Sequence, residues 1–194
     1  MESIKLKGFK KTKDGKYLKN YELYYSNKFG HDKTFEIVSY REIKDISELG
    51  TSVGGVVIAG INNGRLLLLR EFRMGVNRFV YNMCAGRREQ GETIEECAER
   101  ELYEETGLKL RRIIDVLKPA YGAVALSDIA NQLVIAELEG EISDHTEEDE
   151  LIEAAFYTRE EVERLLRDEP FSARAQFVAY SFTKGIFDLG NSYE

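Results

Sequence analysis

The sequence predicts an α/β (α+β) fold: an α/β/α sandwich around a mixed sheet, with an N-terminal antiparallel β extension. Several short segments alternate apolar and polar residues with a period of two, which is typical of strands. Other segments have helical periodicity and capping residues at their ends. The 194 residues, 43% of them hydrophobic, suffice for one globular domain with a leading extension. Strands that alternate with helices in this way favour a layered sandwich.

The extension is predicted to comprise residues 1–45, and the main domain residues 46–194. Alternating segments lie around Ile4–Leu6, at Tyr17–Tyr25 and at Phe35–Tyr40, with turns at Gly15 and Gly30. Because a lone small sheet buries little surface, we expect it to dock on a second copy as a dimerisation arm. Its aromatic side chains would pack in a core or interface, or alternatively stack on a base: Tyr21, Tyr24, Tyr25 and Phe35.

The main domain begins with a predicted hairpin. Two apolar runs, Gly54–Ile61 and Arg65–Phe72, are joined by Asn62-Asn63-Gly64, and Asn and Gly tolerate the positive φ of a tight turn. A third strand is predicted at Phe79–Cys84. Three further strands are predicted downstream, at Ile113–Lys118, Gln132–Leu138 and Ile152–Tyr157.

The first predicted helix covers residues 93–106 and is specified at both ends. Thr93 and Glu96 have the spacing of a capping box, and Gly107 is suited to end the helix in the left-handed conformation. Two more helices are predicted, at Arg159–Arg167 and Ser172–Phe187. Alternation of these helices with the strands supports the sandwich.

Composition excludes several classes of function. The net charge of -8 argues against a broad basic surface, so nucleic acid is not expected as a partner. Apolar runs such as Leu66–Leu69 are too short to span a bilayer, and no signal-peptide core follows the lysine-rich start, so a cytoplasmic protein is expected. Cys84 and Cys97 lack metal or redox spacing and are expected to be reduced core thiols. With only two histidines, a catalytic triad has little support.

The predicted helix at 93–106 directs some of its glutamates inward. With about 100° of rotation per residue, the apolar stripe is centred on Ile94 and is completed by three other residues: Cys97, Ala98 and Leu102. Glu101 and Glu105 fall within about 20° of that centre, and Glu104 lies near the edge of the stripe. A solvated face accounts for the outer glutamates: Glu95, Glu96 and Glu99. Buried carboxylates must be protonated, paired or bound to metal, and this set of oxygen ligands suits magnesium or manganese.

The segment from Gly86 to Leu108 resembles the Nudix box, Gly-five-Glu-seven-Arg-Glu-apolar-any-Glu-Glu-any-Gly-apolar, at every fixed position. A structural helix that matches by coincidence is the alternative. The resemblance implies a Nudix-type sandwich in which a carbonyl and three carboxylates bind metal: those of Ala85, Glu101, Glu104 and Glu105. It also implies structural roles in the motif for Gly86, Glu92, Arg100 and Gly107, with Glu92 pairing with Arg100 to brace the loop.

A weaker resemblance links the strand before the box to the ADP-ribose and nucleotide-sugar pyrophosphatases. Leu69-Arg70-Glu71-Phe72-Arg73 is similar to that group's strand ending in a glutamine or glutamate, an aromatic residue and an arginine. By this resemblance Arg73 would contact a substrate phosphate; an exposed arginine at a strand end is the alternative. The same group commonly has an acidic residue where Asn82 stands and proline or cysteine at Cys84.

The downstream part of the chain resembles that group in one segment and departs from it in another. Glu147–Glu150 is placed like the catalytic loop, so Glu148 and Glu150 would orient or deprotonate the attacking water, with Glu104 as rival. A flexible acidic surface loop is the alternative. The departure is Tyr121–Ile129, which lacks the proline that ADP-ribose members carry about fifteen residues beyond the box. The identity of the sugar and of the nucleotide therefore stays open.

Together these resemblances imply magnesium-dependent hydrolysis of a pyrophosphate bond, with Mn2+ as a substitute for Mg2+. The leading substrates are ADP-ribose, cleaved to AMP and ribose 5-phosphate, and a nucleotide sugar, and the expected assembly is a homodimer through the extension. Two alternatives remain: a hydrolase that removes damaged nucleoside triphosphates, and a module that binds a nucleotide sugar without cleaving it. A calcium-binding structural protein is disfavoured because no Asp-rich loop of the EF-hand type is present.

Overall fold

The computed structural model describes residues 4–143 and 151–186. The chain divides into two compact units that each use two stretches of sequence. The first unit contains Met1–Gly54 with Pro119–Asn131, and the second contains Gly55–Lys118 with Gln132–Glu194. Within the described residues, no helix is both long enough and apolar enough to cross a membrane.

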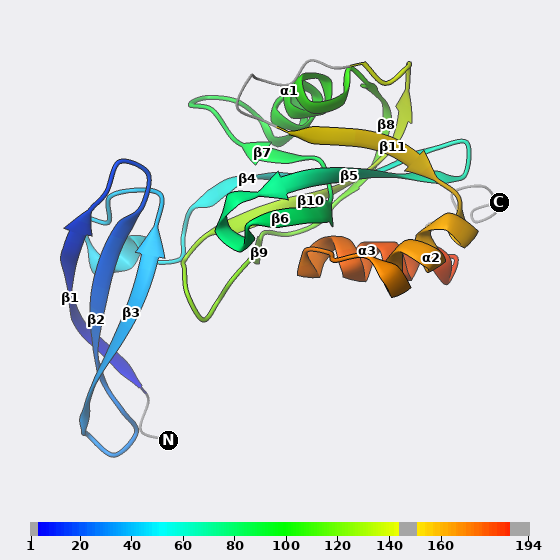
Figure 1. Cartoon of the computed structure of the whole chain (residues 1–194). Coiled ribbons are helices and arrows are strands. Elements are labelled where there is room, and N and C mark those ends of the chain that lie inside the picture. Colours follow the sequence, from blue (N-terminus) through cyan, green and yellow to red (C-terminus); the bar gives the residue numbers. More distant parts are fainter. Residues whose placement is uncertain (1–3, 144–150, 187–194) are drawn as a thin grey trace. The chain divides into compact units, whose positions relative to one another are not determined.

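The first unit is built on a three-stranded antiparallel sheet in the order β1-β2-β3 (Figure 1). Its strands are β1 (Lys5–Asp14), β2 (Lys19–Ser26) and β3 (Asp32–Ser39). The sheet has a small core of its own, made by Tyr21, Leu23, Ile37 and Ile43. Tyr21 is 1% exposed, and its hydroxyl accepts a hydrogen bond from the Ile43 N–H at 2.8 Å. The predicted antiparallel extension is therefore present.

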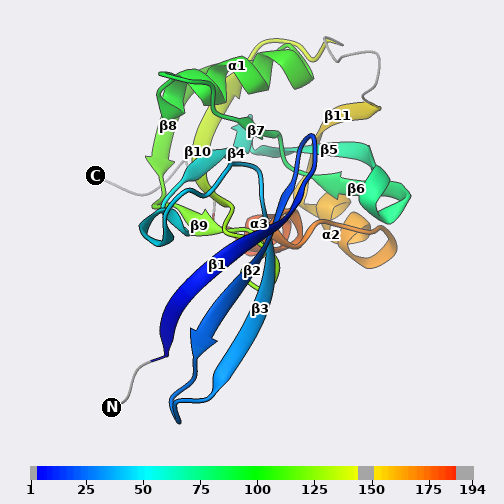
Figure 2. The same cartoon turned by 90° about the vertical axis from the view of Figure 1, so that its left-hand side faces the viewer.

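Strand β1 is longer than the segment predicted around Ile4–Leu6, because it continues through a lysine-rich stretch. These lysines project from the strand into solvent and pair with acidic residues: Lys7 with Asp32 at 2.5 Å and Lys11 with Glu42 at 2.8 Å. These ion pairs offset the positive charge along a strand whose sequence is unusually polar. Figure 2 shows β1, β2 and β3 running alongside one another for most of their length.

The second stretch of the first unit includes the segment Tyr121–Ile129. A short strand that the sequence did not predict, β9 (Ala120–Tyr121), pairs with Ala130 and Asn131. The Val38 N–H of β3 donates to the Leu126 carbonyl at 2.8 Å. The chain therefore packs this segment against its N-terminal strands.

The second unit contains a sheet in which β11-β5-β4-β10-β8 are consecutive neighbours, β6 pairs with β5 and β7 pairs with β4. The strands are β4 (Val53–Asn62), β5 (Arg65–Arg73), β6 (Arg78–Asn82), β7 (Ala85–Arg87), β8 (Lys109–Val116), β10 (Ala130–Glu139) and β11 (Ile152–Tyr157). The β4–β5 hairpin turns at Asn63 and Gly64, with φ of 49° and 73°. The tight turn predicted at Asn62-Asn63-Gly64 is confirmed.

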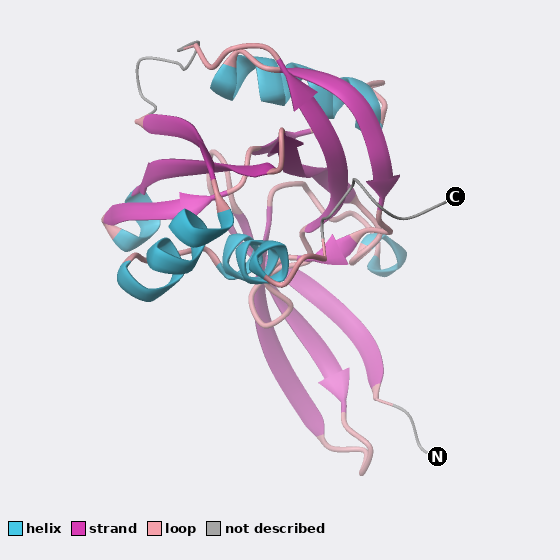
Figure 3. Cartoon of the chain, turned by 90° about the vertical axis from the view of Figure 1, so that its right-hand side faces the viewer, coloured by secondary structure: helices cyan, strands magenta, loops and turns pink. Residues whose placement is uncertain are grey.

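Helices cover both faces of this sheet, as Figures 1 and 3 show. Alternate residues of β4 point to opposite faces: Val56 and Ile58 belong to the core beneath α1 (Ile94–Thr106). Val57 and Ala59 belong to the core beneath α2 (Arg159–Asp168) and α3 (Ala173–Thr183). The predicted α/β/α sandwich is confirmed.

The predicted caps of α1 are present: Thr93 and Glu96 form a capping box, and Gly107 has a φ of 73°. Other predicted boundaries were wrong. The strand predicted at Phe79–Cys84 ends at Asn82, and the chain resumes pairing at Ala85 with β4 instead of β5. Helix α3 ends at Thr183 because the chain takes a positive φ of 77° at Gly185; Phe187 lies outside the described residues.

Candidate functional site

Two glutamates of α1 lie against strand β7, at the start of the loop that precedes the helix. The Glu105 carboxylate accepts a hydrogen bond from the Ala85 N–H, with 3.2 Å between Oε2 and N. The Glu101 carboxyl group lies so close to Gly86 that a Cβ added there would overlap it. Gly86 is therefore required for the close approach of the carboxylate to the backbone. Helix α1 and the start of β7 are therefore in contact through Glu105 and Ala85.

Arg100 connects the loop with the helix. Its guanidinium forms a two-point ion pair with Glu92, at 2.8 Å from Nε and 3.0 Å from Nη2. The same side chain donates to the carboxylates of Glu101 at 2.9 Å and Glu104 at 3.0 Å, and to the Arg87 carbonyl at 2.9 Å. One planar cation thereby holds three carboxylates and a loop carbonyl, an arrangement that lysine cannot reproduce.

The three predicted metal-binding glutamates differ in exposure. The Glu101 side chain is 13% exposed, whereas that of Glu104 is 54% exposed. Burial raises the pKa of Glu105 to about 8 and also raises the pKa of Glu101. By contrast, hydrogen bonds from Arg100 lower the pKa of Glu92 to about 2. The ion pair thus stabilises the charged form of Glu92, while burial disfavours the charged form of Glu105.

These residues fit a divalent cation by the chemistry of their donors. Glu105 would lose much of its charge near neutral pH, because burial is the largest influence on its pKa. A divalent cation beside Glu101 and Glu105 would offset the cost of burying their charges. Hard cations such as Mg2+ favour carboxylate oxygens as ligands. Within residues 4–143 and 151–186, no three acidic, histidine or cysteine side chains converge closely enough to form a metal site as they stand. Glu148 and Glu150 lie outside the described residues.

A second polar cluster lies on β5 and β6. Glu71 is only 7% exposed, and its carboxylate accepts a hydrogen bond from the Asn82 amide at 2.5 Å. Arg73, the predicted phosphate contact, has an exposed side chain with Nη1 3.5 Å from Glu71 Oε1. Neither Glu71 nor Asn82 was predicted from the sequence to be a site residue. The available signal was that Glu71 follows Leu67 and Leu69 at alternate positions of β5, so its side chain shares their face.

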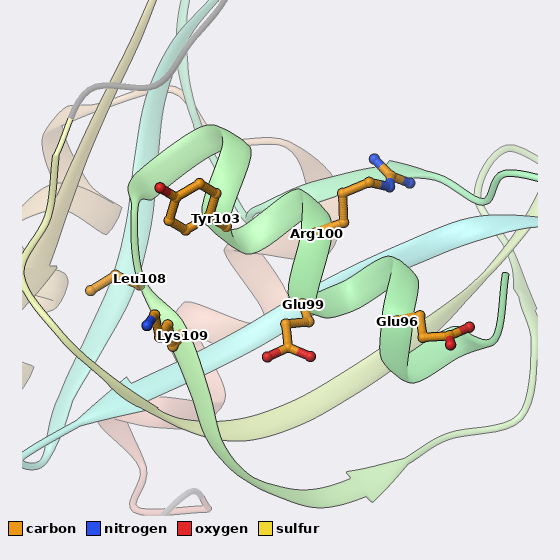
Figure 4. A pocket seen from close by; sticks show the side chains of 6 residues that line it. All are labelled: Glu96, Glu99, Arg100, Tyr103, Leu108 and Lys109. Carbon is orange, nitrogen blue, oxygen red and sulfur yellow. The ribbon is translucent and has the colours of Figure 1, made fainter.

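The outer side of α1 carries a hollow of about 440 Å3 that is distinct from the inward-facing carboxylates (Figure 4). It is lined by Glu96, Glu99, Arg100, Tyr103, Leu108 and Lys109. In Figure 4 the Arg100 side chain points away from Glu99 and Lys109. Glu101 and Glu105 do not line this hollow, so it does not describe the predicted metal site.

The sequence and the fold of this chain are similar to those of known proteins. The NUDIX domain model matches residues 50–179, which include all of Gly86–Leu108. The ADP-ribose pyrophosphatase of Bacillus subtilis (strain 168) is 27% identical over 128 residues, 62% of this chain. The chain spans 66% of that relative, just under two thirds of its length. A solved structure described as an ADP compounds hydrolase has a TM-score of 0.75 at 20% identity, over 97% of this chain and 98% of the other, and shows the shared fold.

Proposed function

Because this chain belongs to the NUDIX domain family, we propose that it hydrolyses the pyrophosphate bond of ADP-ribose, giving AMP and ribose 5-phosphate, or of a nucleotide sugar. The observation that carries this proposal is the position of Glu101 and Glu105, two carboxylates one turn apart that lie against the Ala85–Gly86 backbone. The name of the Bacillus subtilis relative supports an ADP-linked substrate.

The proposed cofactor is Mg2+, with Mn2+ as a substitute. Its ligands are the carboxylates of Glu101, Glu104 and Glu105 and the carbonyl of Ala85. When bound, the ion would neutralise charge on the pyrophosphate and lower the pKa of the attacking water. Burial raises the pKa of Glu105, so its charged form requires an opposite charge nearby, which a bound cation would supply.

The remaining residues hold the loop, bind the substrate or remove a proton. The ion pair of Glu92 with Arg100 fixes the loop that starts at Gly86. Arg73, with its guanidinium extended from the end of β5, would bind a phosphate group of the substrate. A glutamate would take the proton of the attacking water as the bond to phosphorus forms and nucleoside monophosphate leaves. The candidates for this base are Glu104, Glu148 and Glu150.

A substrate panel tests the proposed reaction. The purified chain with Mg2+ is incubated with ADP-ribose, nucleotide sugars and nucleoside triphosphates, and the products are identified by mass. AMP with ribose 5-phosphate, or a nucleoside monophosphate with a sugar phosphate, is the expected result. Preferential cleavage of triphosphates would show a different hydrolase, and tight binding of an intact nucleotide sugar without released monophosphate would show a binding module.

Replacing each candidate base with glutamine measures its contribution to turnover. A loss at Glu148 or Glu150 identifies the base, whereas a loss at Glu104 fits a base or a metal ligand. One of the three variants Glu104→Gln, Glu148→Gln and Glu150→Gln is expected to lower kcat by at least about a hundredfold, since general-base contributions are of that size. The matched control is Glu99→Gln, which changes an exposed glutamate on the outer side of α1. The assignment fails if all three candidate variants turn over as fast as the control.

The proposal includes a cytoplasmic homodimer assembled through residues 1–45. Light scattering of the 22.2 kDa chain is expected to give twice that mass. Phe35, on β3, is 37% exposed, and Phe35→Glu is expected to weaken the dimer by at least about tenfold because a charge would enter an apolar interface. Phe177→Glu is the matched control, as Phe177 is 71% exposed on α3 in the other unit. A monomeric unmodified chain would exclude this assembly.

A further inference from the structure

A chain of hydrogen bonds runs from the start of α3 to the end of β5. The Ser172 hydroxyl donates to Asn82 Oδ1 at 2.7 Å, the Asn82 amide donates to Glu71 Oε1 at 2.5 Å, and Arg73 Nη1 lies 3.5 Å from the same Glu71 oxygen. All four residues belong to the second unit. The chain therefore links the N-terminal cap of a helix to the residue proposed to bind phosphate.

The direction of these hydrogen bonds is fixed by the chemistry of the groups at both ends. A carboxylate can only accept, so the NH2 group of Asn82 must face Glu71. The Ser172 oxygen already accepts the Ala175 N–H as the cap of α3, at 3.3 Å, which leaves its hydrogen for Asn82 Oδ1. Asn82 is thus held in one amide orientation and cannot flip without losing both partners.

The backbone on either side of Ser172 anchors this chain. The Ser172 N–H donates to the Tyr81 carbonyl at 2.9 Å, and the Tyr81 N–H donates to the Pro170 carbonyl at 2.8 Å. The ring of Phe171 stacks on that of Tyr81, with 5.2 Å between their centroids. Ser172 consequently sits at a fixed place beside β6, and its hydroxyl is a rigid support for Asn82.

Glu71 is buried, so the energetic cost of removing its charge from water must be offset by nearby partners. It is 7% exposed and shares the α1-facing side of β5 with Leu67 and Leu69. Burying a charged group is costly unless it is hydrogen-bonded and paired, and Asn82 and Arg73 supply those two interactions. Its negative charge also reaches the carboxyl group of Glu105. Glu71 therefore borders the site on the side of Arg73.

The ion pair with Glu71 restricts the orientation of the Arg73 side chain. Its side chain is 60% exposed, so the long arginine would otherwise sample many rotamers in solvent. We propose that Glu71, held by Asn82 and Ser172, is a positioning residue that preorients the Arg73 guanidinium toward a phosphate group of the substrate. This inference rests on the proposed function, because it takes Arg73 as a phosphate contact. Preorganisation of this type lowers the entropic cost of binding.

The neighbouring Arg70 points to the opposite face of β5 and has partners of its own. Arg70 pairs with Glu153 at 3.1 Å and lies over the ring of Phe79 at 4.1 Å, on the face opposite to that of Glu71. Removing Glu153 therefore breaks an ion pair between β5 and β11 and leaves the Glu71 face of β5 unchanged. Glu153→Gln is the matched control for Glu71→Gln.

The test is a double-mutant cycle measured as binding of ADP-ribose in EDTA, where no turnover occurs. Glu71→Gln is expected to raise Kd about fivefold and Arg73→Gln at least about tenfold. Adding Glu71→Gln to Arg73→Gln is expected to change Kd by less than about twofold, because the effect of Glu71 passes through Arg73. Additive effects, or an unchanged Kd for Glu71→Gln, would overturn the proposal. Absence of binding by the unmodified chain, together with a failed substrate panel, would instead count against the proposed function.

A second variant separates positioning from stability. The exchange Glu71→Gln with Asn82→Asp restores an amide–carboxylate hydrogen bond but moves the charge away from Arg73. Its Tm is expected to return to within about 2 °C of the unmodified chain while Kd stays about fivefold raised. A Kd that recovers together with Tm would show that Glu71 only stabilises the fold. The control Glu153→Gln is expected to leave Kd unchanged.

Discussion

Replacing Gly86 with alanine is expected to lower metal-dependent turnover by about a thousandfold while the chain stays folded. A Cβ at this position would overlap the carboxyl group of Glu101. Because a carboxyl group is the mobile end of a flexible side chain, the fold can accommodate the methyl group by displacing Glu101. Loss of one ligand removes several kcal/mol of transition-state stabilisation, and each 1.36 kcal/mol is a factor of ten in rate. Steady-state kinetics with Mg2+ and a thermal melt measure the two effects.

Two other glycines give the matched comparison. A Cβ at Gly8, on β1, would have an ordinary contact of 4.0 Å with Tyr24, so Gly8→Ala is expected to leave both turnover and melting unchanged. At Gly55 the added atom would overlap the backbone of Gly86, so Gly55→Ala is expected to destabilise the fold itself. Normal turnover by folded Gly86→Ala would contradict the proposed role of Glu101.

The side of α1 on which its glutamates lie was predictable because the determinants are local. One turn of helix separates Glu101 from Glu105, and a rotation of about 100° per residue places both on the side of Cys97 and Ala98. The structure leaves Cys97 and Ala98 fully buried and Glu95, Glu96 and Glu99 exposed, as the sequence analysis predicted. Capping residues fixed the ends of the helix, so its register relative to the loop was also determined.

The second polar cluster was not predictable, because its members are distant in sequence. Asn82 and Ser172 are 90 residues apart, and their hydrogen bond depends on how the connection after α2 returns to the edge of β6. Sequence periodicity carries no information about such pairings. The break between β6 and β7 was missed for a similar reason: Met83 and Cys84 are as apolar as a strand requires, but β7 pairs with β4 rather than β5.

The division of the chain into two compact units also depends on contacts between residues that are distant in sequence. The short segment Tyr121–Ile129 has neither the periodicity of a strand nor that of a helix. Its place in the first unit follows from backbone hydrogen bonds such as the one between Val38 and Leu126.

The variant Glu105→Gln is expected to be inactive and yet more stable than the unmodified chain at high pH without metal. Burial raises the folded-state pKa of Glu105 to about 8 from its ordinary value of 4.5. Between these two values the unfolded chain releases the proton and the folded chain keeps it, so the free energy of unfolding falls as pH rises. The full difference is at most about 5 kcal/mol above pH 8, at 1.36 kcal/mol for each unit of pKa. Glutamine has no proton to release and avoids this loss.

Urea denaturation in EDTA at pH 5 and pH 9 measures the difference. The two chains are expected to be similar in stability at pH 5, and the variant is expected to unfold at higher urea concentration at pH 9. Addition of Mg2+ should raise the stability of the unmodified chain more at pH 9 than at pH 6, because the ion competes with the Glu105 proton. Its effect on the variant should be smaller and should depend less on pH. Equal stabilisation of both chains by Mg2+ at pH 9 would remove Glu105 from the metal site. Glu96→Gln, an exposed change on the same helix, controls for the loss of a negative charge.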